Sequence, residues 1–225
     1  MDGIDAFDRD VTAALMRVAA REGWRGTTLR RVADEAGTTL AALRARFADR
    51  AAILDRFSAV VDAAVLAGTA PPSEADTAKD RLFDVLMRRF DALGPHRAGV
   101  LACWRGLRND PVALACRAPA ALTSMRWMLE AAGIPAAGPL GMLRAKGLVA
   151  VWVSVFRTWE NDETADLGPT MAALDTALTR AESVAETLEP LLGGRRRAGQ
   201  APPAPPATGE PGPPPGAASE PDTLK

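Results

Sequence analysis

Hydroxyl and basic side chains are frequent between Thr27 and Arg50, in the stretch TTLRRVADEAGTTLAALRARFADR. Hydroxyl, guanidinium and backbone N–H groups bind phosphates, and arginine or a small apolar contact can distinguish base edges in the major groove. This chemistry is that of contact with double-stranded DNA. The residues that it singles out are Thr28, Thr38, Thr39, Leu40, Arg44, Arg46 and Arg50.

Two short helices across a glycine turn would position these side chains. Thr28 is placed to cap a helix over residues 29–36, and Thr39 to cap a second over residues 40–46, with Gly37 as the permissive turn. The second helix of such a helix-turn-helix enters the major groove by its N-terminal residues. The side chains nearest the bases would be Thr38, Thr39, Leu40 and Arg44, and those suited to phosphates Arg46 and Arg50.

The charge around this unit is mixed. The whole chain has 27 basic and 28 acidic residues, so DNA binding must depend on a local patch. Residues 1–60 hold ten arginines against nine carboxylates, and the acids include Asp2, Asp5, Asp8 and Asp10 at the start. Between residues 37 and 50, however, three arginines face a single carboxylate. The local excess favours DNA binding, and the acidic N-terminus opposes it.

Residues 14–54, ALMRVAAREGWRGTTLRRVADEAGTTLAALRARFADRAAIL, resemble the DNA-binding domain of the TetR family of bacterial one-component repressors. The resemblance rests on REGW at the end of the first helix, TT before the second, VADEAG at its close, and LxxxFxDRxxIL leading into the fourth. It implies an all-helical homodimer that binds a palindromic operator, with a larger C-terminal domain whose small-molecule ligand weakens DNA binding. The family usually has a tyrosine where Arg44 stands, and arginine can also contact phosphate or guanine.

The remaining chain of 225 residues is also patterned for helices, so the predicted fold class is all-α. We expect three parts: a helix-turn-helix domain over residues 1–60, a helical ligand-binding and dimerisation domain over 61–192, and a disordered tail over 193–225. The tail holds nine of the eighteen prolines and few side chains that could pack.

Helix-capping residues and prolines predict where the C-terminal helices begin. Ser73 and Asp76 resemble a capping box, and Asp110 followed by Pro111 resembles an N-cap with proline in the first turn. Further helices are expected over about 120–132, over about 140–159, and from about 169 onward. The last of these helices bears a heptad stripe, which either packs within the chain or joins two subunits through the last two helices. The stripe consists of Met171, Leu174, Leu178, Ala181, Ala185 and Leu188.

Tryptophan and methionine concentrate in the C-terminal part, where such residues usually form core. The family resemblance implies that some of them line a cavity for a small apolar effector. The candidates for this lining are Phe83, Met87, Phe90, Trp104, Leu107 and Trp127.

No catalytic or metal-binding pattern is present, so neither an enzyme nor a cofactor is expected. His96 is the only histidine and has no marked partner, and Cys103 and Cys116 are expected to be small core residues. The N-terminus is acidic where a signal peptide would be basic, and the apolar run at 147–156 is shorter than the ~20 residues of a membrane span. A cytoplasmic protein without a membrane span is expected.

A second resemblance covers residues 125–182. MRWMLEAAGI, followed by a long apolar helix that ends in WENDETAD and then a final helix, is similar to the lipid-binding accessory protein of ubiquinone (coenzyme Q) biosynthesis, which shares the TetR fold. This similarity implies a hydrophobic site for an isoprenoid or quinone intermediate and a partner enzyme instead of an operator.

Overall fold

The computed structural model describes residues 3–70 and 75–197, with side chains through Thr187, and these residues form helices and turns only. The predicted all-α fold is confirmed. The N-terminal helices are α1 (Ala6–Gly26), α2 (Leu29–Glu35), α3 (Leu40–Arg46) and α4 (Arg50–Gly68). The C-terminal helices are α5 (Ala78–Leu93), the short 3-10 helix η1 (Gly94–His96), α6 (Arg97–Leu107), α7 (Pro111–Ala131), α8 (Gly138–Asn161) and α9 (Gly168–Arg197).

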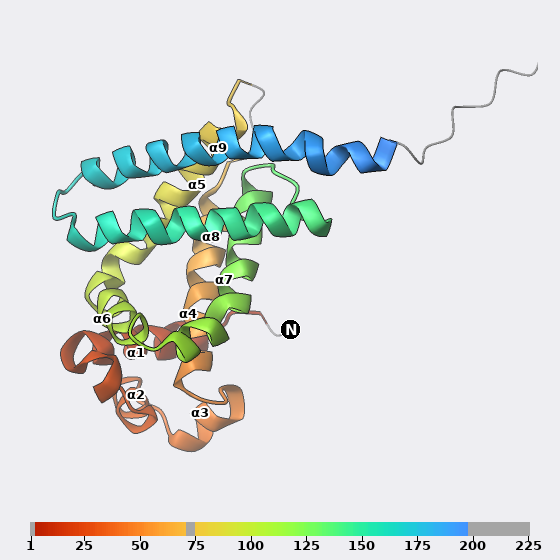
Figure 1. Cartoon of the computed structure of the whole chain (residues 1–225). Coiled ribbons are helices and arrows are strands. Elements are labelled where there is room, and N and C mark those ends of the chain that lie inside the picture. Colours follow the sequence, from red (N-terminus) through yellow and green to blue (C-terminus); the bar gives the residue numbers. More distant parts are fainter. Residues whose placement is uncertain (1–2, 71–74, 198–225) are drawn as a thin grey trace, which may run out of the picture.

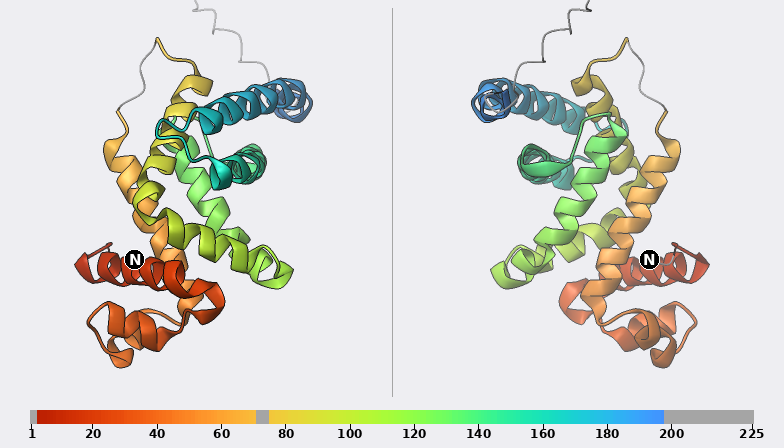
Figure 2. Two further views of the ribbon diagram at one scale, coloured as in Figure 1. Left: turned by 90° about the vertical axis from the view of Figure 1, so that its left-hand side faces the viewer. Right: turned by 90° about the vertical axis from the view of Figure 1, so that its right-hand side faces the viewer.

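The small helices α2 and α3 lie at one end of the molecule, and the long helices α8 and α9 lie side by side at the other (Figure 1). Figure 2 shows α7 between α4 on one side and α8 on the other. One continuous core runs through this arrangement, from Leu15 and Val32 in the N-terminal helices to Phe90 and Trp159 in the C-terminal ones. The α4 helix continues through the domain boundary expected near residue 60, so that division remains a prediction.

The α1 helix joins the two ends because it packs directly on α6. A Cβ atom added at Gly99 would lie 2.3 Å from the carbonyl oxygen of Met16, and one added at Gly106 would lie 2.4 Å from Cβ of Trp24. Only glycine leaves room for this contact at either position. The absence of side chains at these two glycines of α6 therefore lets α1, and with it the helix-turn-helix, pack closely on the larger domain.

Two expected helix boundaries in this part of the chain differ from those observed. The capping box of α5 is formed by Thr77 and Asp80, one turn later than the predicted pair, whose Ser73 lies outside the described residues. The cap at Asp110 is confirmed, but α7 continues past Pro119 through residues 120–131, so two expected helices are one.

The heptad stripe of α9 packs within the chain at its centre, where Leu174 is fully buried and Leu178 is 4% exposed. Burial inside a single subunit excludes these two leucines from an intersubunit seam. The helix extends to Arg197, whereas the sequence placed the start of the tail at 193. Residues 198–225, which make up the rest of the expected tail, lie outside the described residues, as does the side chain of Leu188.

Within the part of the chain that the structure describes, α8 alone has the length and composition that could cross a membrane. This helix packs against α7 and α9, and its last turns bury Phe156 and Trp159 in the core. Only 33% of its apolar window is buried within the chain, so much of the α8 surface is not covered by the core.

Candidate nucleic-acid interface

The two predicted caps and the turn between them are confirmed. The hydroxyl of Thr28 accepts a hydrogen bond from the N–H of Arg31 at 3.3 Å, and that of Thr39 accepts one from the N–H of Ala42 at 3.1 Å. Gly37 has a φ of 63°, which a residue with a side chain rarely adopts. The sequence thus folds locally into a helix-turn-helix whose second helix is α3.

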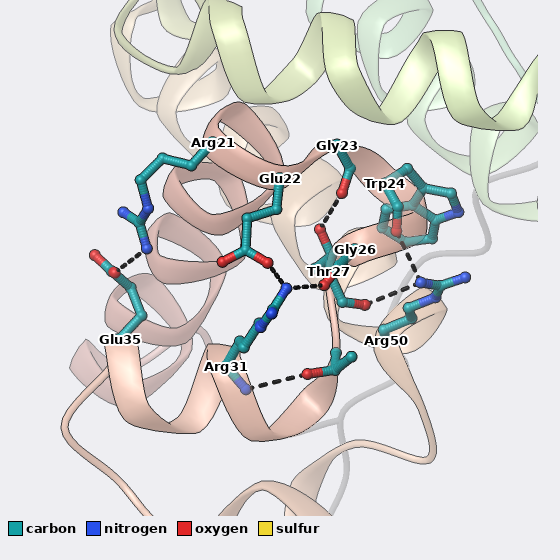
Figure 3. A network of polar contacts seen from close by, with 10 residues as sticks. Arg21, Glu22, Gly23, Trp24, Gly26, Thr27, Arg31, Glu35 and Arg50 are labelled. Atoms are coloured by element: carbon teal, nitrogen blue, oxygen red, sulfur yellow. Dashed lines mark hydrogen bonds and ion pairs between the residues drawn. The ribbon is translucent and has the colours of Figure 1, made fainter.

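Salt bridges hold α2 against α1. Arg17 and Arg21 both donate to the carboxylate of Glu35, at 2.6 Å and 2.5 Å. Arg31 pairs with Glu22 and donates to the carbonyl oxygen of Gly26, and Figure 3 shows these side chains bridging the two helices. All three arginines therefore orient the helix-turn-helix.

Arg50, expected at a phosphate, instead anchors the turn between α1 and α2. Its guanidinium donates to the carbonyl oxygens of Trp24 and Thr27, at 2.8 Å and 2.9 Å, and lies 4.5 Å from the centre of the Trp24 ring. Figure 3 shows it between these groups, beside the hydrogen bond from the Thr27 hydroxyl to the Gly23 carbonyl. The carbonyl of Trp24 also accepts the backbone N–H of Thr27 at 3.3 Å, so Arg50 adds a second donor to the turn that ends α1.

Arg46, the other expected phosphate contact, is paired with the acidic N-terminus. It donates to Asp5 at 2.6 Å and to Asp8 at 3.4 Å, and its guanidinium lies over the Phe7 ring. The N–H of Asp8 and the guanidinium of Arg46 lower the pKa of the Asp5 carboxyl. Asp8 is fully buried and also lies 3.7 Å from Arg56. Two of the four N-terminal acids thus join α1 to α3 and α4.

The exposed end of α3 has a different character. Leu40 is 42% exposed, Thr39 is exposed, and Thr38 is half-buried behind them. Arg44 is exposed and has no hydrogen bond, ion pair or ring contact within the described residues. The same is true of Arg30, which the sequence reasoning missed, although its place in the first turn after the Thr28 cap could have indicated it.

The six candidates for ligand lining lie in or around an aromatic cluster. Phe90 stacks on Trp152 with ring centres 4.4 Å apart, and Trp104 packs edge-on to Phe156 at 5.4 Å. Leu107 is buried, and Phe83 and Met87 are half-buried beside the core. Trp127 is 53% exposed on the outer side of α7. The set is therefore spread over the domain, and its role in binding remains a prediction.

A surface groove of about 530 Å³ lies elsewhere in the same domain and contains none of the six candidates. Its walls come from the start of α5, the turn after α7, the first half of α8 and the middle of α9. The side chains of its apolar floor are Leu82, Leu129, Ile134, Leu140, Leu148, Val151 and Leu178. The sequence could not indicate this groove, because its walls come from four separate segments spread over residues 78–186.

A buried polar cluster was also missed. Arg89 of α5 pairs with Asp62 of α4, and the hydroxyl of Ser124 on α7 donates to the same carboxylate at 2.8 Å. The guanidinium lies 5.2 Å from the centre of the Trp152 ring. Two buried N–H groups, on Nε of Arg89 and Nε1 of Trp104, have no acceptor among the described residues.

The histidine and the two cysteines are the remaining side chains that could do chemistry. His96 packs edge-on against Phe57 at 5.3 Å, and burial lowers the pKa of its imidazole. Cys103 is buried, as expected, and burial raises the pKa of its thiol to about 12. Cys116 is exposed on α7, so the expectation that it is a core residue is wrong.

Comparison with known proteins supports the reading of the N-terminal unit. Residues 11–57 match the family model described as bacterial regulatory proteins, tetR family. No curated protein matched this chain. Solved structures of TetR transcriptional regulators do resemble it. One, from Nitrosomonas europaea ATCC 19718, has a TM-score of 0.63 at 19% identity, covering 79% of this chain and 99% of that one.

A second such structure, a TetR regulator from Rhodococcus sp. RHA1, has a TM-score of 0.56 at 21% identity and covers 78% of this chain and 94% of that one. At these identities the likeness shows the fold alone. The match to the family model covers the N-terminal helix-turn-helix. The chain therefore has an N-terminal helix-turn-helix that matches the tetR family model and an overall fold similar to that of these solved TetR regulators.

Proposed function

We propose that this chain acts in the cytoplasm as a repressor: a homodimer binds a palindromic operator, and a small apolar ligand of the C-terminal domain releases it. The observation that carries the proposal is the exposed surface of α3, where Leu40 is 42% exposed and Arg44 makes no hydrogen bond, ion pair or ring contact with the described residues. Arg46 and Arg50 bind partners within the chain, whereas Arg44 binds none among the described residues, so its guanidinium is available to contact DNA.

The proposed DNA contacts divide by role. Arg44 reads a base edge or binds a phosphate, and Leu40 packs on a thymine methyl. The capped helix starts at Thr28 and Thr39 offer N–H groups to phosphates, helped by Arg30 on α2. Arg46 and Arg50 hold the unit in shape, because their guanidinium groups already bind partners within the chain.

The proposed subunit interface uses the outer faces of α8 and α9. Met142 and Leu143 of α8 and Val184 of α9 are large apolar side chains that a single chain leaves exposed. Replacement of Val184 by Glu should shift the protein toward monomer in sedimentation. Replacement of the exposed Val112 on α7 by Glu is the matched control. An unchanged dimer in both variants would place the interface elsewhere.

Ligand release would follow from a shift in population between two arrangements of the dimer. The recognition helices of a bound dimer lie about 34 Å apart, the repeat of the major groove. A ligand that binds more tightly to an arrangement with another spacing lowers operator affinity. The loss is at most the difference between its binding free energies for the two arrangements. The close α1–α6 contact at Gly99 and Gly106 would carry the change between the domains.

The experiment that tests this function is a titration of the protein against a fluorescent duplex from its own upstream region, with random duplex as competitor, at two salt concentrations. Specific binding well above the competitor is expected, and the salt slope counts the phosphates contacted. A reporter gene behind the same region should become more active when the protein is removed. Equal affinity for both duplexes at low salt would overturn the proposal.

The comparisons do not favour the alternative, a lipid-binding accessory protein of ubiquinone biosynthesis. The solved structures that resemble this chain are described as regulators, and the family match covers the helix-turn-helix itself.

A further inference from the structure

The α6 helix lies between α1 and the end of α8 at which the chain turns into α9 (Figure 1). At 3.6 residues per turn, or about 100° per residue, Arg97 and Arg108 share one face of α6. Gly99 and Gly106 lie on the opposite face, which packs on α1. One face of this helix therefore contacts the N-terminal domain, and the other is turned toward α8.

Arg97 closes the C-terminal end of α8. Its Nη2 group donates to the carbonyl oxygens of Trp159 at 2.6 Å and of Asp162 at 2.7 Å, and its guanidinium lies 4.5 Å from the centre of the Trp159 ring. The last carbonyls of a helix lack donors from within it, and a cation beside them also interacts favourably with the helix dipole. Arg97 is half-buried and Trp159 is buried, so water competes weakly for these bonds.

The same end of α8 is joined to α9 and, a second time, to α6. The carboxylate of Asp162 accepts hydrogen bonds from the hydroxyl and the N–H of Thr170, in the first turn of α9, at 2.6 Å and 3.0 Å. The carboxylate of Glu160 accepts from Arg105 at 3.0 Å and from Arg108 at 3.4 Å. These two arginines are about half exposed, so this second contact with α6 is the weaker one.

A continuous set of contacts thus runs from the turn between α8 and α9, through α6, to α1. Trp104 of α6 also packs edge-on against Phe156 of α8, with ring centres 5.4 Å apart. Apolar packing depends little on direction, whereas hydrogen bonds weaken steeply when their angle changes. The two bonds of Arg97 are therefore the contact that most restricts the angle between α6 and α8.

We propose that Arg97 is a positioning residue for operator recognition. By holding α6 to the turn between α8 and α9, it fixes where each subunit carries its helix-turn-helix, and so sets the half-site spacing that the dimer accepts. The proposal rests on the proposed regulatory function for operator recognition, whereas the placement of the helix-turn-helix relative to α9 is measured without DNA. Arg97 acts through α6 and α1 and does not itself contact DNA.

The first test measures this placement as the distance between spin labels on α3 and α9 of one chain, by double electron–electron resonance. Ala45→Cys and Ser183→Cys, at exposed positions, carry the labels in a Cys116→Ser background, and an excess of unlabelled protein suppresses signals between subunits. Arg97→Met removes the donors and should broaden the distribution of distances, because α6 can then rotate against α8. An unchanged distribution would overturn the proposal.

Arg81→Met is the matched control. Arg81 is half-buried like Arg97 and donates at 2.8 Å to the carbonyl oxygen of Ala132, the residue that ends α7, so this variant also removes an arginine from a helix end. Its distribution should stay as narrow as that of wild type. Arg97→Lys, which keeps a cation and its donors, should broaden the distribution less than Arg97→Met. Equal broadening by Arg81→Met and Arg97→Met would show a general effect of lost stability and contradict a special role for Arg97.

The second test measures operator recognition by the same variants without labels. The operator is located by footprinting on the upstream duplex, and is compared with a duplex that keeps a single half-site and with one that has a base pair inserted at the centre. Arg97→Met should bind the operator roughly tenfold more weakly than wild type, because the two half-sites are no longer met at the matching spacing. Its affinity for the single half-site should be unchanged, and the inserted base pair should weaken its binding less than that of wild type. An equal loss on the operator and on the single half-site would remove the positioning role.

The two proposals fail separately. If wild type binds no duplex specifically while Arg97→Met broadens the distances, the regulatory function fails and the placement by Arg97 stands. If wild type binds the operator and Arg97→Met keeps both its distances and its spacing preference, only the positioning role fails. Circular dichroism and thermal unfolding show whether each variant folds. If Arg97→Met does not fold, Glu160→Gln, which weakens only the second contact between α6 and α8, takes its place: a smaller broadening supports the proposal, and none contradicts it.

Discussion

The guanidinium of Arg46 lies 2.6 Å from the carboxylate of Asp5, and this ion pair joins the end of α3 to the start of α1. Asp8 contributes a second carboxylate to the same arginine. Acidic residues that would repel a phosphate backbone in an extended arm are here close to a cation of the recognition unit. The acidic N-terminus therefore cancels the charge of one cation of the recognition unit, and α3 offers less positive charge to DNA than its arginines alone would.

Arg46→Ala should change specific operator affinity by less than about threefold, because its guanidinium is already bound to Asp5 and Asp8. The same variant should unfold at a lower temperature, since Asp8 then loses a buried partner. Duplex titration and thermal unfolding measure the two effects. A large loss of operator affinity with unchanged unfolding would show that Arg46 leaves the carboxylates to bind DNA.

Arg44→Ala should weaken operator binding by about 1–3 kcal/mol if the side chain reads a base, with a smaller effect on random duplex. The reason is that Arg44 is exposed and unpaired on α3 within the described residues. Equal losses on the two duplexes would identify a phosphate contact. Unchanged binding to both would remove Arg44 from the interface.

Gly99→Ala should destabilise the protein by about 1–3 kcal/mol, because the new Cβ would overlap the backbone of Met16 and force α6 away from α1. Gly147→Ala is the control: its Cβ meets open space, and alanine in a helix is favoured over glycine by about 0.5–1 kcal/mol. Chemical denaturation compares the variants. Equal stability for both would mean that the α1–α6 contact relaxes freely.

Asp162→Asn should destabilise the protein at neutral pH and lose that effect in acid. Thr164 and Thr170 donate to the two carboxylate oxygens, which lowers the pKa of Asp162 from 3.8 to about 2. A depressed pKa in the folded state adds stability above the unfolded value of 3.8, and this stability is lost as the pH falls through about 2.

The measurement is thermal unfolding of wild type and variant across this pH range, with the exposed Glu163→Gln as control. The difference in unfolding temperature between wild type and Asp162→Asn should narrow as the pH falls from 3.8 to about 2. The unfolding temperature of the control should stay close to that of wild type throughout. A gap that is independent of pH would show that the threonines do not depend on the ionised carboxylate.

One thiol per chain should react rapidly with a disulfide reagent in the native protein. Cys116 is exposed, whereas burial keeps Cys103 inaccessible and raises its pKa to about 12. Cys116→Ser should therefore remove the fast reaction, and unfolding should restore one thiol. Rapid reaction of both cysteines would show that α6 opens readily from α1.

The sequence by itself determined the local features of this protein. The caps at Thr28 and Thr39 and the turn at Gly37 were predictable because each depends on a few neighbouring residues and on backbone geometry. The helical periodicity also predicted the fold class, and the family motif predicted the kind of DNA-binding unit.

Only the tertiary structure decided which arginines are free. Arg46 and Arg50 bind carboxylates and carbonyls 23 to 41 residues away, while Arg44 on the same short segment does not. The groove and the buried Asp62–Arg89 pair likewise depend on helices that the chain brings together from a distance. Residue type and spacing specify what a side chain can bind, but burial and long-range packing determine whether it is still available to do so.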